Sequence, residues 1–495
     1  MIRVTSVKTM RQSDAATILG GVPGKELMAR AGRGIYQSYA WKGPVAIVCG
    51  SGNNAGDGYV LALELLSAGI ECTVVLLSEH FSEDGAYYFG QCREAGVPIV
   101  AYTEEFFFDK YSEIVDCIFG TGFSGEVTSP VREVIEKING SGKAVICADI
   151  NSGLNGDSGS GALCVKSDLT VSIGTYKTGH FLGDAKDSIK ARCNLDIGID
   201  VPDEGMGVCE DSDFVDVLYQ RKQNSHKGSY GYVCVMGGSR EYSGAVKLAN
   251  MSAAALRAGC GVVQLAVPSA IADSVSPYLL ESTLLPFPTD LDGHMKYTPE
   301  LLDTLLSRMA AIAVGMGWGT GSDHERILAH LLSNGEIPLV IDADGLNALS
   351  RLDKELLRKT RCAVTVTPHP KEFERLCGVS VAEILKDPIC YAKAFAKEYG
   401  VTVLLKGCTT VVTDGDCTYL VDRGCAGMGT AGSGDVLSGI LAGLLGYAPA
   451  TAKTVACGAY IAGRAGELAE SLTNPISMVA SDTVACIARA IGEMI

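Results

Sequence analysis

Gly50-Ser-Gly-Asn-Asn-Ala-Gly-Asp-Gly58 stands between the apolar run Val45-Ala-Ile-Val-Cys49 and the amphipathic run Tyr59-Val-Leu-Ala-Leu-Glu-Leu-Leu66. This order predicts a buried strand, a glycine-rich turn and a helix, the unit from which parallel α/β sheets are built. The glycines let the backbone turn tightly, and the helix that follows presents free N–H groups to an anion. The stretch therefore predicts an α/β fold with a phosphate-binding loop.

The same loop is a poor match to the dinucleotide-binding fingerprint G-x-G-x-x-G. Ala55 stands where the third glycine is expected, and Asn53, Asn54 and Asp57 add polar groups that the fingerprint lacks. A hydride-transferring dehydrogenase is therefore the weakest of the functions that we considered. The pattern N-N-x-G-D-G is more specific than the fingerprint.

The length, composition and net charge of the chain limit the number of domains, the class of protein and the kind of partner. A chain of 495 residues is too long for one core and predicts two or three domains. With 47% apolar and 20% charged residues, it is typical of a globular protein. A net charge of −16 argues against a nucleic-acid partner but allows a small anionic ligand.

The pattern of cysteines and the N-terminal segment indicate in which cellular compartment the protein is found. No C-x-x-C pair occurs among the 18 cysteines, which favours free thiols in a reducing cytosol, and the 7 histidines show no zinc-binding spacing. Neither a signal peptide nor an apolar run long enough to span a membrane is apparent. We expect a cytoplasmic protein with no membrane partner.

Strand and helix patterns alternate in two blocks, which predicts parallel sheets in both. In the first block, the predicted strands are Val45–Cys49, Thr73–Leu77, Ile114–Phe119, Ala144–Asp149 and Leu169–Ile173. In the second block, they are Gly231–Met236, Gly261–Val267, Ala311–Gly315, Pro338–Ile341, Ala363–Thr367 and Val401–Leu405. Predicted helices include Tyr59–Ala68, Pro130–Ile138, Gly244–Ala258, Val381–Glu398 and Gly434–Leu445. The acidic segment between residues 200 and 213 is interpreted as a link, and the predicted domains are residues 1–215 and 216–495.

Two further loops of the first block leave strand ends. They are Asp116-Cys-Ile-Phe-Gly-Thr-Gly-Phe-Ser-Gly125 and Asp149-Ile-Asn-Ser-Gly-Leu154. An aspartate at the end of one buried strand is as often a structural cap as a functional group. Ligands bind at the carboxyl ends of parallel strands, however, and three polar loops at one edge favour a site there.

In this order, G-x-G-N-N-x-G-D-G, D-x-x-F-G-T-G and D-x-x-S-G-L resemble the NAD(P)H-hydrate epimerases, over roughly residues 1–215. The resemblance implies a Rossmann-like three-layer αβα domain with Asp149 as the catalytic acid/base, itself in contact with the substrate. It implies a potassium ion on Asn54, Asp116 and Ser152, and hard oxygen ligands suit such a cation. The other residues implied to hold the hydrated dinucleotide are Asn53, Asn54, Ala55, Gly56, Asp57, Gly120, Thr121, Gly122, Phe123, Ser124, Gly125 and Glu126.

Two positions depart from that pattern. Ala55 replaces a glycine, which is tolerable where φ stays negative. Asn151 replaces a proline, a change expected mainly to loosen the loop.

In the second block, Gly427-Met-Gly-Thr-Ala-Gly-Ser-Gly-Asp-Val-Leu-Ser-Gly-Ile-Leu441 is the most informative segment. A glycine-rich turn opens an apolar helix whose first turn carries Asp435. Free N–H groups there stabilise charge on a transferring phosphoryl group, and an aspartate can take the proton of the attacking hydroxyl. The alternative is a glycine-rich helix start whose aspartate only favours the helix dipole. Gly439 and Gly443 are expected to permit close helix packing.

Four other segments accompany it: His226-Lys-Gly-Ser-Tyr-Gly231, Gly315-Met-Gly-Trp-Gly-Thr-Gly321, Thr367-Pro-His-Pro-Lys-Glu-Phe-Glu374 and Lys406-Gly-Cys-Thr-Thr410. Together they resemble the ADP/ATP-dependent NAD(P)H-hydrate dehydratases, a branch of the ribokinase-like superfamily, over roughly residues 216–495.

That second resemblance implies a ribokinase-like αβα domain with Asp435 as catalytic base and a magnesium ion that accompanies ADP or ATP. The residues implied to contact the hydrate are Ala245, Gly317, His369 and Asp435. Those implied to bind the nucleotide are Lys406, Gly407, Cys408, Thr409, Thr410 and Gly434. Ser433 replaces a threonine but keeps the hydroxyl, and Asp342-Ala-Asp-Gly-Leu-Asn347 receives no assigned role.

The two halves together predict a bifunctional enzyme. One domain would interconvert the R and S hydrates of NADH or NADPH, and the other would phosphorylate the hydrate and release phosphate to restore the double bond. Two alternatives stay open: a ribokinase-like kinase of a small alcohol, and a non-catalytic nucleotide-binding or dimerising first domain. We expect small-molecule ligands and a homo-oligomer.

Overall fold

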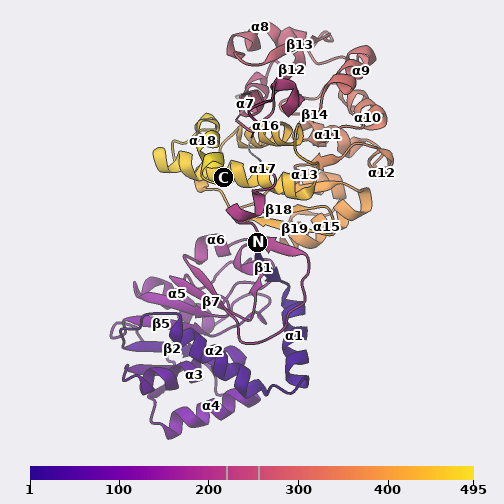
Figure 1. Cartoon of the computed structure of the whole chain (residues 1–495). Coiled ribbons are helices and arrows are strands. Elements are labelled where there is room, and N and C mark those ends of the chain that lie inside the picture. The colour runs from indigo at the N-terminus through magenta and orange to yellow at the C-terminus, as the bar shows by residue number, and fades with distance from the viewer. Residues whose placement is uncertain (219–220, 255–256) are drawn as a thin grey trace. The chain divides into compact units, whose positions relative to one another are not determined.

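The computed structural model describes residues 1–218, 221–254 and 257–495. The chain divides into two compact units (Figure 1). One unit is Arg3–Glu204, and the other is Gly205–Ile495 together with Met1–Ile2. The domain limits predicted from the sequence stay a prediction.

The first unit is built on a parallel sheet in the strand order β4-β3-β2-β5-β6-β7-β9. The strands are β2 (Val45–Cys49), β3 (Cys72–Leu76), β4 (Ile99–Ala101), β5 (Glu113–Cys117), β6 (Ala144–Ala148), β7 (Leu169–Ile173) and β9 (Arg192–Leu195). The helices are α1 (Val7–Leu19), α2 (Gly24–Gln37), α3 (Asn53–Ser67), α4 (Glu83–Glu94), α5 (Val131–Gly140) and α6 (Ala185–Ser188). A separate parallel pair joins β1 (Ile2–Thr5) to β8 (Tyr176–Lys177).

Helices cover both faces of this sheet because its strands are apolar on both faces. Val45, Ile47 and Cys49 of β2 pack in one core with residues of α2 and α3. Ala46 and Val48 point the other way, into a core shared with α5. This alternation with burial on both sides is characteristic of a parallel sheet between two helical layers. The predicted three-layer α/β class is confirmed for this unit.

The second unit has a sheet in the order β13-β12-β11-β14-β15-β16-β17-β18-β19-β10. It is parallel from β13 to β17, antiparallel through β18 and β19, and parallel again from β19 to β10. The strands are β10 (Met206–Val208), β11 (Tyr232–Met236), β12 (Val262–Pro268), β13 (Thr283–Phe287), β14 (Ala311–Val314), β15 (Leu339–Ile341), β16 (Val364–Val366), β17 (Thr402–Leu405), β18 (Thr410–Thr413) and β19 (Thr418–Val421).

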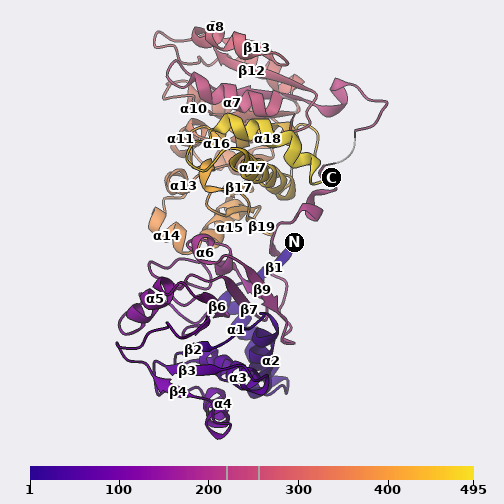
Figure 2. The same ribbon diagram turned by 90° about the vertical axis from the view of Figure 1, so that its left-hand side faces the viewer.

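Most helices of the second unit lie between successive strands in the chain, and the last three follow the last strand. They are α7 (Ser243–Ala254), α8 (Ala272–Val275), α9 (Pro299–Arg308), α10 (His324–Asn334), α11 (Asp344–Arg351), α12 (Glu355–Lys359), α13 (Pro370–Cys377), α14 (Val381–Lys386), α15 (Pro388–Tyr399), α16 (Ser433–Leu445), α17 (Ala452–Leu472) and α18 (Ala480–Gly492). Residues of α7, α16, α17 and α18 share one core, and α16 lies beside α17 (Figure 2). None of the described helices has the length and apolar character of a membrane span.

Three details differ from the sequence-based predictions. The single helix predicted over Val381–Glu398 is two helices, because Pro388 lacks an N–H group and Asp387 caps the second helix through Cys390 N (3.0 Å). The predicted link contains β10, which pairs with β19, so this part of the link is a strand of the second sheet. Residues 255 and 256 of the helix predicted over Gly244–Ala258 lie outside the described residues.

Close helix packing at Gly439 is confirmed and yields a stability prediction. A Cβ atom at Gly439 would lie 2.1 Å from the carbonyl oxygen of Ala249 in α7. We expect Gly439→Ala to lower the free energy of unfolding of this unit by about 2–3 kcal/mol, because α7 and α16 must move apart. The control is Gly492→Ala in α18, where a Cβ meets nothing within 4 Å and helix propensity favours alanine. Calorimetry that gave both variants the same transition temperature would contradict this prediction.

Candidate functional site

A cavity of about 670 Å³ opens at the carboxyl edge of the first sheet. The loops after β2, β5 and β6 form one side of it. The other lining residues come from α1, α2, the start of α3, α4, the end of β7, β8 and the segment after β9. The predicted site residues in its lining are Asn53, Asn54, Asp57, Gly120, Thr121, Gly122, Phe123, Ser124 and Asp149. Asp116 and Ser152 are buried beside it, and Ala55, Gly56, Gly125 and Glu126 are not in the lining.

Asp149 is held by three neighbours in a strained backbone conformation. Its φ is +63°, a region that costs a non-glycine residue about 1–3 kcal/mol. One carboxylate oxygen, Oδ1, accepts a hydrogen bond from Lys177 Nζ (2.6 Å), and the other accepts one from Thr121 N (2.9 Å). The Asp149 carbonyl lies 2.7 Å from His180 Nε2. The side chain is therefore fixed in the cavity before any ligand binds.

Lys177 controls the ionisation of Asp149. Its side chain is 2% exposed, and its ammonium also donates to the Ile173 carbonyl (2.7 Å). Burial alone opposes ionisation of Asp149, but the Lys177 charge and the hydrogen bonds outweigh it and hold the pKa of Asp149 below its usual value. Burial and then the Asp149 charge raise the pKa of Asp57 well above its usual value. The cavity thus contains two neighbouring carboxyl groups whose pKa values are shifted in opposite directions.

Two of the three residues predicted to bind potassium contact the Phe119 carbonyl, and the third, Asp116, is linked to them through Ser152. Asn54 Nδ2 donates to that carbonyl (2.9 Å), and Ser152 Oγ lies 3.3 Å from it. Ser152 Oγ also donates to Asp116 Oδ1 (2.6 Å). Asn54 Oδ1 is buried and has no hydrogen-bond partner among the described residues. An orphaned amide oxygen near a buried carboxylate and a carbonyl fits a cation that prefers oxygen ligands.

Asn151 does not loosen its loop as the sequence suggested. Its fully buried amide donates to the Val165 carbonyl (2.8 Å) and to Ser167 Oγ (3.0 Å), and it accepts from Thr170 Oγ1. These bonds restrain the loop in place of a proline ring. At the other departure from the family pattern, Ala55 keeps a negative φ, since Asp149 and Ala343 are the non-glycine residues with positive φ among those described.

In the second unit, the start of α16 meets the loops of the sheet. Gly432 takes a left-handed conformation (φ +96°) and places Asp435 in the first helical turn. A Cβ at Gly434 would lie 3.5 Å from Lys406 Nζ and 3.7 Å from Asp342 Oδ2. Ser433 Oγ is buried and finds no hydrogen-bond partner in the described part of the chain. The structure thus brings Ser433, Gly434, Asp435 and Lys406 together at a helix N-terminus, which suits an anion.

Asp342 is the deepest carboxylate of this centre. It is 2% exposed, and it accepts from Lys406 Nζ (2.9 Å) and from Ser438 Oγ (2.7 Å). Burial opposes its charge, but Lys406 outweighs burial and holds the pKa of Asp342 below its usual value. Lys406 also lies 3.8 Å from Glu372 Oε2.

Asp435 differs from Asp342 in its protonation. Burial and then the negative charge of Asp342 raise the pKa of Asp435 to about 7, although Lys406 opposes the shift. A carboxyl group that titrates near neutral pH is matched to proton transfer at that pH.

The remaining predicted residues of the second unit lie on neighbouring loops. Gly317 (φ +60°) lies against α7, since a Cβ there would be 2.9 Å from the Ala245 Cβ. His369 is half-exposed and caps α13, where its Nδ1 accepts from Lys371 N (3.1 Å). In the hairpin between β17 and β18, Gly407 and Cys408 are exposed, Thr410 is partly exposed and Thr409 is buried.

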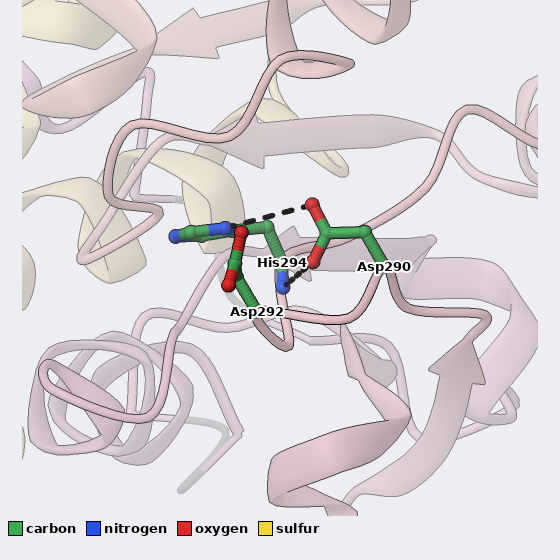
Figure 3. A group of neighbouring side chains, drawn as sticks. All are labelled: Asp290, Asp292 and His294. Atoms are coloured by element: carbon green, nitrogen blue, oxygen red, sulfur yellow. Dashed lines mark hydrogen bonds and ion pairs between the residues drawn. The ribbon is translucent and has the colours of Figure 1, made fainter.

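A group that fits a metal ion by spacing alone lies on the turn after β13 (Figure 3). Asp290, Asp292 and His294 offer ligand atoms within 4.8 Å of one another. Asp290 already accepts from His294 N (2.8 Å) and lies 3.6 Å from the His294 imidazole. These contacts explain the cluster as a turn that the Asp290 side chain closes.

Sequence reasoning missed one charged residue of these centres, Lys177, and left another, Asp342, without a role. Lys177 lies in none of the motifs quoted above, and the available signal was a lysine four residues after the uncharged strand Leu169–Ile173. Asp342 follows the predicted strand Pro338–Ile341, and its place at a strand end was the available signal.

Comparisons with known proteins cover both units. A family model described as "NAD(P)H-hydrate dehydratase" matches residues 233–489, and one described as "YjeF-related protein N-terminus" matches residues 24–179. The chain is 33% identical to a bifunctional NAD(P)H-hydrate repair enzyme of Moorella thermoacetica, over 93% of this chain and 91% of that one. It is 31% identical to an enzyme of the same name from Coxiella burnetii, over 96% of each chain.

Solved structures resemble part of the chain. A hypothetical protein from Streptococcus mutans covers 58% of this chain and 99% of its own, with a TM-score of 0.51 and 21% identity. A ribokinase-like superfamily protein from Enterococcus faecalis covers 60% of this chain and 98% of its own, with a TM-score of 0.50 and 21% identity. At this identity the likeness shows the fold alone, and it agrees with the predicted ribokinase-like class.

Proposed function

The chain belongs to the family of bifunctional NAD(P)H-hydrate repair enzymes, and we propose how its two centres divide the work. The protein returns hydrated NADH and NADPH to the reduced dinucleotides. It epimerises the R and S hydrates and dehydrates one of them at the expense of ADP or ATP. We assign epimerisation to the cavity around Asp149 and dehydration to the centre around Asp435. The observation that supports this assignment is the contrast between an ionised Asp149 and an Asp435 that titrates near neutral pH.

At the first centre, Asp149 is the proton carrier. The hydrate bears its hydroxyl on the carbon next to the ring nitrogen, so inversion needs a bond at that carbon to break and reform. Asp149 takes the hydroxyl proton as the carbon–nitrogen bond opens to an aldehyde, and the electron pair of that bond stays on the ring nitrogen, conjugated with the remaining double bond and the carboxamide. After the aldehyde turns its other face to the nitrogen, the nitrogen attacks the carbon and Asp149 returns the proton to the oxygen. Lys177 positions the carboxylate and keeps it ionised. Asp57 lines the same cavity, and its raised pKa reduces the negative charge that it places against the phosphates.

A potassium ion on Asn54, Asp116 and Ser152 would supply fixed positive charge beside the dinucleotide phosphates. We therefore expect epimerisation to fall when K⁺ is replaced by the larger tetramethylammonium ion, and to recover when K⁺ returns. Asn54→Ala removes the orphaned oxygen and is expected to raise the K⁺ concentration for half-maximal activity about tenfold. Nucleotide-dependent dehydration of the pure S hydrate is the internal control. Equal K⁺ dependence of Asn54→Ala and the unchanged protein would contradict this site.

At the second centre, Asp435 acts as the base in phosphoryl transfer. It takes the proton of the hydrate hydroxyl as that oxygen attacks the terminal phosphoryl group of ADP or ATP. The carbon–oxygen bond then breaks with phosphate as the leaving group, and loss of a proton from the neighbouring carbon restores the double bond. The free N–H groups of α16, the Ser433 hydroxyl and Lys406 hold the nucleotide phosphates.

Magnesium is expected to arrive with the nucleotide. The carboxylates of Asp342, Asp344 and Asp435 act on one another electrostatically, and Lys406 is the cation among them. This excess of negative charge fits a bound divalent cation, which would neutralise charge on the transferring phosphoryl group.

The test uses a mixture of R and S hydrated NADH, with ADP, ATP or no nucleotide, followed by the absorbance of the reduced nicotinamide. The unchanged protein should recover all of the NADH only when nucleotide is present. Asp149→Asn should stall once one epimer is spent, provided that spontaneous epimerisation is slow, because dehydration is stereospecific. No recovery with either nucleotide would overturn the proposed function.

We also propose a cytoplasmic location, which the free cysteine thiols throughout the described residues support. Self-association into a homo-oligomer stays a prediction, and light scattering on the purified chain tests it.

A further inference from the structure

The epimerase cavity has an unfavourable charge balance for a dinucleotide. Its lining contains the carboxyl groups of Asp14, Asp57, Asp84 and Asp149, whereas its cations are Arg11 and Lys177. Lys177 is already paired with Asp149 at 2.6 Å. A pyrophosphate adds two negative charges, and the proposed K⁺ offsets only one of them, so a further cation that is not already paired would stabilise its binding.

Arg11 is that cation. It lies on α1, lines the cavity, and is exposed. Among the described residues its guanidinium has no ion-pair partner. A Cβ placed on Gly122 would lie 3.1 Å from Arg11 Nη2, so the guanidinium rests against the Gly120–Gly122 turn.

Contacts near the start of α1 hold this helix in place. Arg11 therefore stays at the cavity although its guanidinium has no ion-pair partner among the described residues. The N–H of Val7 donates to Asp157 Oδ1 (2.7 Å), and Thr9 Oγ1 donates to Glu204 Oε1 (2.9 Å). Met10 packs over Gly174, where a Cβ would lie 2.6 Å from the Met10 Cε. A cationic side chain on a well-anchored helix, with no ion-pair partner among the described residues, is suited to bind an anionic ligand.

The Gly120–Gly122 turn relates the position of Arg11 to that of the Asp149 carboxylate. A Cβ at Gly120 would lie 3.0 Å from Asp149 Oδ2, the catalytic end of the cavity. Gly122 is two residues further, and two residues span at most about 7 Å. That span suits one ribose, which separates the nicotinamide ring from its own phosphate. The phosphate on the adenosine ribose of NADPH lies at the far end of the dinucleotide.

On the basis of the proposed epimerase function, we infer that Arg11 binds the nicotinamide-side phosphate of the hydrated dinucleotide. It would share this phosphate with the N–H groups at the start of α3, where Gly52, Asn53 and Asn54 also line the cavity. Because NADH and NADPH both carry this phosphate, Arg11 serves both hydrates equally.

The experiment compares Arg11→Ala with the unchanged full chain on three substrates: hydrated NADH, hydrated reduced nicotinamide mononucleotide, and hydrated reduced nicotinamide riboside, which has no phosphate. Epimerisation is followed by chromatographic separation of the R and S forms without added nucleotide. We expect kcat/KM to fall about tenfold for the two phosphate-bearing substrates and to be equal in both proteins for the riboside. Arg11→Lys, which keeps the charge but loses the planar fork, should recover part of the loss.

The control is Arg93→Ala on α4, which removes an exposed arginine of the same unit outside the cavity lining. Failure of the unchanged protein to epimerise any hydrate would overturn the proposed function itself. A working unchanged protein with Arg11→Ala equally active on all three substrates would overturn the role of Arg11 alone. Equal losses on the riboside would also overturn it, because they would show an effect independent of phosphate. A loss on hydrated NADH with none on the hydrated mononucleotide would place Arg11 at the adenosine-side phosphate and overturn this assignment.

Discussion

Asp435→Asn is expected to lower kcat for nucleotide-dependent dehydration by about three orders of magnitude. The amide keeps the size and the hydrogen-bonding oxygen of the carboxylate but cannot accept the hydroxyl proton. The measurement is the initial rate of NADH formation from pure S hydrate at saturating ADP or ATP. Epimerisation, which is assigned to the other unit, should continue at the unchanged rate.

The control for Asp435→Asn is Asp482→Asn. Asp482 also lies in the first turn of a helix of the second unit, α18, and its carboxylate accepts from Val479 N (2.9 Å). If Asp435 only favoured its helix dipole, the two variants would behave alike. Near-normal dehydration by Asp435→Asn would remove the assigned base.

The same assignment predicts a pH profile. Because burial and Asp342 raise the pKa of Asp435 to about 7, the group is ionised above that pH and protonated below it. The value of kcat/KM for dehydration should therefore be full above pH 7 and fall as the pH drops through 7. Lys406→Met removes the charge that opposes this shift, so the midpoint should move to higher pH. A profile that stays flat from about pH 5 to 8 would contradict a base with this pKa.

The sequence was most informative where local pattern decides the structure. The apolar run Val45–Cys49 and the glycines that follow it predicted β2, its turn and the helix α3, and the structure has the strand at the predicted bounds. The same holds for Leu169–Ile173. Strand–turn–helix units depend on neighbours in sequence, so apolar periodicity and glycine position are enough to predict them.

The charged pairs at the two centres could not be predicted in this way. Lys177 lies 28 residues after Asp149, and Lys406 lies 64 residues after Asp342. Asp342 and Lys406 meet because they follow two strands of one sheet, β15 and β17, whereas Asp149 follows β6 and Lys177 lies in β8, which pairs with β1. The order and pairing of strands leave no mark in local composition. The direction of each pKa shift depends on burial and on the partner, which only the folded chain defines.

At the first centre, removal of the Lys177 charge is expected to have the largest effect on pH dependence. Burial by itself raises the pKa of Asp149, and the Lys177 ammonium reverses this. In the unchanged protein Asp149 is therefore ionised at neutral pH, and epimerisation should be lost only as the pH falls through a value below the usual range of an aspartate. In Lys177→Met the folded pKa of Asp149 rises, so the loss should begin at higher pH. The measurement is kcat/KM for epimerisation of hydrated NADH from about pH 4 to 8.

The stability of Lys177→Met should fall as well, since a buried carboxylate left without its cation costs about 3–5 kcal/mol. The double variant Asp149→Asn with Lys177→Met removes both charges and should recover much of that loss without recovering activity. Lys190→Met is the matched control, because Lys190 pairs with Asp168 at 3.3 Å on the surface and is 79% exposed. A purely structural role for Lys177 would lower stability and leave the pH midpoint where it was. An upward shift of the midpoint in Lys177→Met, absent in Lys190→Met, would therefore identify Lys177 as the residue that keeps the base ionised.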